Sequence, residues 1–137
     1  MRYPYREIAK GLVGPIVDIE IWTDGRWVKF DACVDSGAAY TIFHTDNAEI
    51  LGLNYRHGRR IMIRVGDGKL IPVYMHKLPV QFSGQKFTAT IGFSESLGVG
   101  FNLLGRVSFF DRFRICFNDK EKIVDTTYLE AGTKDNG

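Results

Sequence analysis

Short stretches of alternating apolar and polar residues, separated by turn residues, run along most of the chain. Ile16–Trp22 alternates with a period of two, which is typical of a half-buried strand, and Trp27–Val34 follows the Asp24-Gly25 turn. The same order of strand, turn and strand recurs three more times. These later pairs are Arg60–Val65 with Lys69–Met75, Leu78–Phe82 with Lys86–Ile91, and Arg114–Phe117 with Lys122–Asp125. The pattern therefore predicts a chain built mainly from hairpins.

Helical patterns are scarce by comparison. Thr45–Leu51 starts with capping residues and ends before Gly52, which predicts one short helix. Ser108–Phe113, which follows the break at Gly105, is a second candidate. Closely spaced hairpins with so few helices predict an all-β fold, a small closed or folded-over β-sheet, and argue against βαβ units.

Length and composition narrow the class of protein. A chain of 137 residues fits one domain, which we place at residues 11–128 between frayed tails at 1–10 and 129–137. The 15 glycines, together with 10 Phe, 6 Tyr and 2 Trp, suit a turn-rich β-protein with an aromatic core. A net charge of +2 is too small to indicate a polyanionic partner.

The sequence also favours a soluble chain without a metal. No apolar run approaches the ~18 residues of a transmembrane helix, and residues 1–10 lack the apolar segment of a secretory signal. Cys33 and Cys116 are too few for a disulfide framework, and no His or Cys spacing fits a metal site. We therefore expect a cytoplasmic protein with no membrane partner and no bound metal.

One segment carries candidate chemistry. The apolar residues Ala32–Val34 lead directly into Asp35, and a carboxylate at the end of a buried strand must be hydrogen-bonded or shifted in pKa. Gly37 allows a sharp turn, and the Ser36 hydroxyl can brace that turn. Taken alone, Asp35-Ser36-Gly37 is explained equally well as an ordinary turn.

A second segment lies about seventy residues later, where the apolar pair Leu103-Leu104 is followed by Gly105 and Arg106. The pair of segments, with hairpins between them, resembles the retropepsin-like aspartic proteases. Asp35-Ser36-Gly37-Ala38 matches the catalytic loop of that family, and Leu103-Leu104-Gly105 matches the strand that passes beside the loop. The resemblance covers roughly residues 16–117.

The resemblance implies a role for each of these residues. Asp35 would be the catalytic carboxyl, with Ser36 and Gly37 shaping its loop and Ala38 beginning the substrate-facing wall. Support from beneath the loop would come from Leu104, Gly105 and Arg106, and the flap that closes over substrate would have its tip at Gly66, Asp67 and Gly68.

It also implies a mechanism and an assembly. Proteases of this class hold two carboxyls close together, so that one acts as base and the other as acid toward a water nucleophile. This chain has a single Asp-Ser-Gly string, so the implied active unit is a homodimer in which Asp35 of each copy meets at the two-fold axis. We therefore expect an aspartic endopeptidase that acts on peptides or proteins and needs no cofactor.

Two departures place the chain nearer to cellular and bacterial members than to retroviral ones. Retroviral enzymes carry an acid directly after the catalytic loop, where this chain has Ala39, so Arg106 needs a different partner. The chain also continues for one more strand beyond Phe117, where retroviral proteases end and their termini build the dimer interface.

Three alternatives remain open at this stage. The same fold could serve as a non-catalytic, dimeric peptide-binding or scaffolding domain. The basic stretch Arg56–Arg60, with Arg64 and Lys69, could bind nucleic acid, although a solvated surface explains it more simply and we expect no nucleic-acid partner. Ser36 could be a nucleophile paired with a histidine, but the nucleophile-elbow motif is absent around it.

Overall fold

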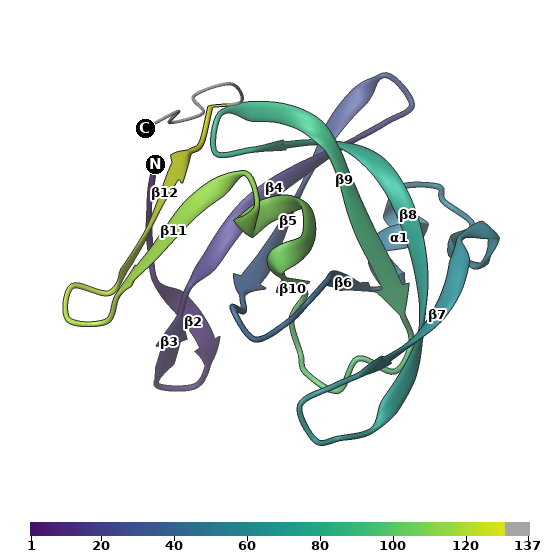
Figure 1. Ribbon diagram of the computed structural model, residues 1–137, viewed down its shortest axis with the longest axis horizontal. Helices are drawn as coiled ribbons and strands as arrows, with labels where there is room; N and C mark the ends of the chain where they lie inside the picture. The colour runs from purple at the N-terminus through teal and green to yellow at the C-terminus, as the bar shows by residue number, and fades with distance from the viewer. Residues whose placement is uncertain (131–137) are drawn as a thin grey trace, which may run out of the picture.

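The computed structural model describes residues 1–130, and these form short strands with little helix (Figure 1). The one regular α-helix, α1, spans Thr45–Ile50, and short helical turns occur at η1 (Tyr55–His57) and η2 (Arg106–Phe110). The strands are β1 Arg2–Pro4, β2 Arg6–Ala9, β3 Leu12–Gly14, β4 Ile16–Thr23, β5 Arg26–Val34, β6 Thr41–His44, β7 Arg59–Arg64, β8 Leu70–Phe82, β9 Gln85–Ser94, β10 Leu103–Leu104, β11 Phe113–Asn118 and β12 Ile123–Tyr128.

Most of the strands form one sheet that closes on itself. Its order is β4-β5-β10-β6-β9-β8-β7, and an additional pairing of β4 with β8 joins the two sides into a barrel, leaving β7 as an extension on β8. This closure removes most of the exposed sheet edges. The predicted all-β, barrel-like fold class is confirmed.

The expected hairpins are present, and the two expected helices differ in outcome. The first helix, predicted at Thr45–Leu51, is α1 and ends one residue earlier. The second was predicted at Ser108–Phe113, but the chain coils over Arg106–Phe110 instead and β11 begins at Phe113. Regular helix cannot form there because Val107 is extended and Ser108 has a φ of +76°.

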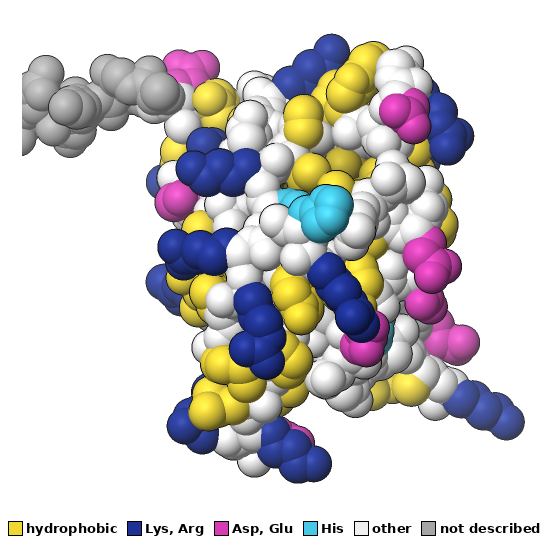
Figure 2. All heavy atoms as spheres, turned by 90° about the vertical axis from the view of Figure 1, so that its right-hand side faces the viewer, with side chains coloured by type: hydrophobic (Ala, Val, Ile, Leu, Met, Phe, Trp, Pro, Cys, Tyr) yellow, Lys and Arg dark blue, Asp and Glu magenta, His cyan; other side chains and the backbone are white. Residues whose placement is uncertain are grey.

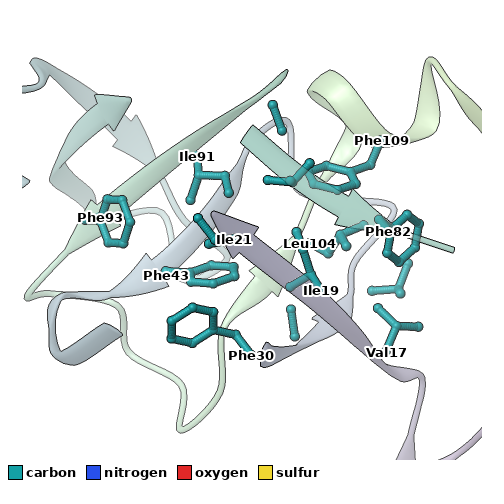
Figure 3. Packing of buried hydrophobic residues seen from close by; sticks show 14 of the residues in the cluster. Val17, Ile19, Ile21, Phe30, Phe43, Phe82, Ile91, Phe93, Leu104 and Phe109 are labelled. Carbon is teal, nitrogen blue, oxygen red and sulfur yellow. The ribbon is translucent and has the colours of Figure 1, made fainter. Parts of the chain in front are cut away.

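The interior of the barrel is filled by the inward face of β4 and by phenylalanines from several other strands (Figure 3). Val17, Ile19 and Ile21 alternate along β4 and are fully buried, as the period of two predicts. Phe43 packs edge-to-face on both Phe30 and Phe93, with ring centroids 5.8 Å and 6.2 Å away. Much of the aromatic excess of the sequence is thus core.

The expectation that residues 1–10 fray is wrong. Arg2–Pro4 forms β1, which pairs with β12 in a three-stranded sheet with β11. The ring of Tyr3 stacks on Phe82 at 6.2 Å, so the strand is held by apolar contact as well as by backbone hydrogen bonds. At the other end, Leu129 donates its N–H to the Arg112 carbonyl, and residues 131–137 of the expected tail lie outside the described part.

None of the helices within residues 1–130 has the length and apolar character that a membrane crossing requires.

Candidate active site

Asp35 follows the last residue of β5, at the point where a short crossing strand fixes the backbone. In β10, Leu103 and Leu104 pair in parallel with Cys33 and Val34, and Leu103 also pairs with Ile42 of β6. The Asp35 N–H donates to the Leu104 carbonyl at 2.9 Å. The acidic residue is therefore anchored by a segment that lies far away in the sequence, as the paired motifs implied.

The loop that begins at Asp35 is closed by its own hydrogen bonds. Asp35 is half-buried, and its Oδ1 accepts the N–H of Gly37 at 2.9 Å. The Ala38 N–H donates to the Asp35 carbonyl at 3.1 Å. One carboxylate oxygen is thus used to hold the loop, and the side chain as a whole is oriented by the turn that follows it.

Arg106 finds its hydrogen-bond partners in the backbone of this loop. Its N–H donates to the Ala38 carbonyl at 2.9 Å, and its guanidinium donates to the Ser36 carbonyl at 3.3 Å. The guanidinium also lies 5.9 Å from the ring centroid of Phe110. With Ala39 in place of an acid, the arginine binds backbone oxygens of the loop instead of a carboxylate.

Gly105 lies where the backbone after β10 passes close to the backbone of residues 38–40. A Cβ at this position would be 2.3 Å from the Tyr40 carbonyl oxygen and 2.8 Å from that of Ala38. The Gly105 N–H donates to the hydroxyl of Thr41 at 2.9 Å, and both residues are buried. Sequence reasoning missed Thr41; its signal was a polar residue at the start of β6, directly before the apolar pair Ile42-Phe43.

The β7–β8 hairpin reaches toward the Asp35 loop and lies on the same side of the barrel in Figure 1. Its turn is held by the Gly68 N–H, which donates to the Val65 carbonyl at 2.8 Å, and by Asp67 Oδ1, which accepts the Lys69 N–H at 2.9 Å. Gly68 has a φ of +86°, whereas the space around Gly66 is open. These are the residues that the resemblance implied as a flap tip.

Two cavities meet at Asp35, with volumes of about 420 Å³ and 350 Å³. Both are bounded by Asp35, by Leu103 beneath and by Val65 and Gly66 of the hairpin. The larger one is otherwise walled mainly by the apolar side chains of the loop after β9. The structure thus brings Asp35 and Gly66 to one cleft, whereas Gly68 lies in the turn outside it.

Cys33 lines the larger cavity two residues before Asp35. Burial raises the pKa of its thiol, and the nearby Asp35 carboxylate raises it further. A thiol held in its neutral form is a poor nucleophile, so Cys33 acts as a small apolar wall residue. Cys116, by contrast, is exposed on β11.

The serine alternative gains nothing from the geometry. Ser36 is exposed, and none of the histidines within residues 1–130 hydrogen-bonds to it; His57 bonds to the Asn54 side chain and His76 to the Tyr55 carbonyl. The described part of the chain also contains no cluster of three or more His, Cys, Asp or Glu that could hold a metal ion.

The closed barrel, its acidic loop and the hairpin above that loop together define an acid-protease type of fold. Solved structures share this fold, among them two proteases. A retropepsin-like aspartic protease from Rickettsia conorii has a TM-score of 0.58 and 18% identity over 82% of this chain and 96% of that one. EIAV protease complexed with the inhibitor HBY-793 has a TM-score of 0.51 and 17% identity over 68% of this chain and 82% of that one.

Sequence comparison adds no relative, since neither a protein-family model nor a curated protein matches the chain. The structural likeness is therefore the finding that decides the fold. The chain has the retropepsin-like fold, as its two motifs predicted.

Proposed function

We propose that this protein is an aspartic endopeptidase in which Asp35 of two identical chains forms the catalytic pair. The observation that carries the proposal is the position of Asp35, half-buried at the junction of two cavities and below the β7–β8 hairpin. The likeness to two aspartic proteases supports it at the level of the fold.

The chemistry requires a second carboxyl, and one chain does not offer a suitable one. Among the described residues that bound the two cavities, the other carboxylate is that of Asp67. Its Oδ1 already holds the hairpin turn, and its Oδ2 lies 4.0 Å from the Lys69 ammonium. Asp67 is thus committed to the turn, and a second copy of Asp35, brought in by two-fold symmetry, supplies the pair.

In the assembled pair the two carboxyls share one proton, because like charges so close together cannot both ionise. The ionised carboxylate takes a proton from water as the water oxygen attacks the scissile carbonyl carbon. The protonated carboxyl donates its proton to the forming oxyanion. When the C–N bond breaks, the carboxyl that took the water proton gives it to the leaving amine, and the other carboxylate takes a hydroxyl proton from the collapsing gem-diol, so the pair returns to its shared-proton state.

The homodimer makes activity dependent on concentration. Specific activity in peptide cleavage is expected to fall as the protein is diluted below its dimer dissociation constant, because a monomer holds half of the catalytic pair. A statine-type transition-state mimic should bind with a stoichiometry of one molecule per two chains. Constant specific activity across the dilution series, or one mimic per chain, would contradict the shared site.

The same titration separates the protease from a scaffold of the same fold. A dimer that binds extended peptides but neither cleaves them nor binds the mimic more tightly than a substrate would be a peptide-binding domain. Tight binding of the mimic requires both carboxyls at the site.

The hairpin offers a second test. Gly66→Val is expected to lower kcat/KM roughly tenfold with little change in Tm, because the position borders both cavities yet has no neighbour within 4 Å. Gly100→Val is the matched control, since Gly100 is equally open but lies outside both cavities. Equal kinetics in the two variants would make the hairpin an ordinary turn.

A further inference from the structure

A third cavity, of about 330 Å³, continues the cleft away from Asp35. Tyr40 forms part of its wall and also part of the 350 Å³ cavity beside Asp35. The two cavities therefore adjoin at one side chain. The 350 Å³ cavity thus lies in the middle of the cleft and is called the middle cavity below. An extended peptide that runs from Asp35 through the middle cavity reaches the third cavity next.

Strand β7 provides the common wall of this path. Ile61 and Ile63 are partly buried, whereas the four other residues of the strand, Arg59, Arg60, Met62 and Arg64, are exposed. Arg59 and Ile61 border the third cavity, and Ile63 borders the middle one together with Arg64 at the end of the strand. Because alternate residues of a strand share a face, about 7 Å apart, one face of β7 runs along both cavities.

The third cavity is rich in cations and lacks a counter-charge. The cations are Arg59 and Lys77, His76 lines the same cavity, and its described lining contains no carboxylate. Within residues 1–130, neither Arg59 nor Lys77 takes part in an ion pair or a side-chain hydrogen bond, whereas the nearby Arg56 is paired with Glu95 at 3.1 Å. Figure 2 shows Lys and Arg side chains spread over one face of the molecule among hydrophobic side chains.

The rest of the cavity is fitted to a side chain with an aliphatic stem. Ile61, Met75 and Val107 contribute apolar surface to the same space as the cations. His76 is fixed, because its Nε2 donates to the Tyr55 carbonyl at 2.7 Å and its ring packs edge-on against Phe93 at 5.6 Å. An apolar floor with cations at its rim matches a glutamate better than any other common side chain.

We propose that the third cavity is a specificity subsite that takes an acidic side chain of an extended peptide substrate. The inference rests on the proposed endopeptidase function. Alternate side chains of an extended peptide point the same way, so the acid lies two residues beyond the residue held in the middle cavity. Two-fold symmetry places the same subsite on both flanks of the scissile bond.

The test is a set of matched peptides with Glu, Gln or Lys placed singly at the second to fifth positions on each flank. We expect kcat/KM for Glu to exceed that for Lys about tenfold at one position on each flank. Added salt should weaken this preference, because the charges are partly exposed. The same peptides bound to Asp35→Asn protein report the preference in Kd without turnover.

Variants of the cavity residues test which side chains cause the preference for Glu. Arg59→Gln with Lys77→Gln should remove the preference for Glu, and Arg59→Glu with Lys77→Glu should turn it toward Lys. Arg60→Gln is the control for Arg59→Gln, because it removes one positive charge from the neighbouring residue of β7, which does not line the third cavity, and it should leave the preference intact.

The outcomes separate this inference from the function on which it rests. Peptides cleaved without regard to charge, or a preference that survives the double Gln variant, overturn the subsite and leave the protease intact. If no peptide is cleaved, the proposed function fails, and the Kd series still decides the subsite. Loss of single-stranded RNA binding in the double variant, with an unchanged peptide preference, would assign the cations to nucleic acid.

Discussion

Asp35→Asn is expected to abolish peptide cleavage, lowering kcat/KM roughly 10³-fold or more, while the protein folds and dimerises normally. Asparagine cannot take a proton from water or return one to the oxyanion, so both halves of the pair are lost at once. The fold should survive because the Asp35 Oδ1 accepts the Gly37 N–H, and an asparagine oxygen accepts the same bond. The measurement is kcat/KM on a cleaved peptide beside Tm and dimer dissociation.

The chain provides two matched controls for this substitution. Asp31→Asn changes an exposed carboxylate on β5, the strand that leads into Asp35, and Asp67→Asn changes the other carboxylate that borders the larger cavity. Both should retain activity within a fewfold of the unchanged protein. Cleavage that persists in a pure Asp35→Asn preparation, or a loss in Asp67→Asn as severe as in Asp35→Asn, would overturn the mechanism.

Features that depend on neighbouring residues could be predicted from the sequence. The Asp24-Gly25 turn is one, because both residues have positive φ, 46° and 78°, which is the backbone that a tight hairpin between twisted strands requires. The register of β4 is another, since its alternation decides which face is buried. These rules were enough to predict an all-β chain of hairpins.

Features that depend on distant residues could not be derived in this way. β10 has two residues and owes its existence to pairing with β5 and β6 on either side, so it has no local signal. β8 was expected as two strands with a break near His76, but it is continuous because its first half pairs with β7 and its second half with β9. The contact of Asp35 with Leu104 was reached only through the family resemblance.

The basic stretch at residues 56–60 shows that side chains adjacent in the sequence need not form one surface cluster. The stretch Arg56–Arg60 looks like one cluster in the sequence, yet Arg56 is paired with Glu95, and Arg59 lines the third cavity whereas Arg60 does not. Arg59 and Arg60 are adjacent in β7, so their side chains point to opposite faces of the strand. Arg59 pairs with Met75, two residues before Lys77 on β8, so the meeting of Arg59 and Lys77 at one cavity requires the fold.

Gly105→Ala is expected to cost about 3 kcal/mol of unfolding free energy and to lower kcat/KM roughly 100-fold in the protein that remains folded. The added methyl would lie 2.3 Å from the Tyr40 carbonyl oxygen and 2.8 Å from that of Ala38, and backbone atoms cannot turn aside as a side chain can. Any relief moves the segment after Asp35, which breaks the bonds from Arg106 and Val107 to the loop. Denaturant unfolding and peptide kinetics measure the two effects.

The expected losses of stability and activity in Gly105→Ala come from a steric clash and not from backbone strain. A control variant tests this distinction. Gly105 has a φ of −105° and a ψ of −166°, which any residue adopts, so alanine brings no dihedral strain. Gly100→Ala adds the same methyl where nothing lies within 4 Å, and it should change stability by less than about 1 kcal/mol with full activity. If Gly105→Ala were as stable and active as Gly100→Ala, the close packing of β10 against the Asp35 loop would not be what positions the carboxylate.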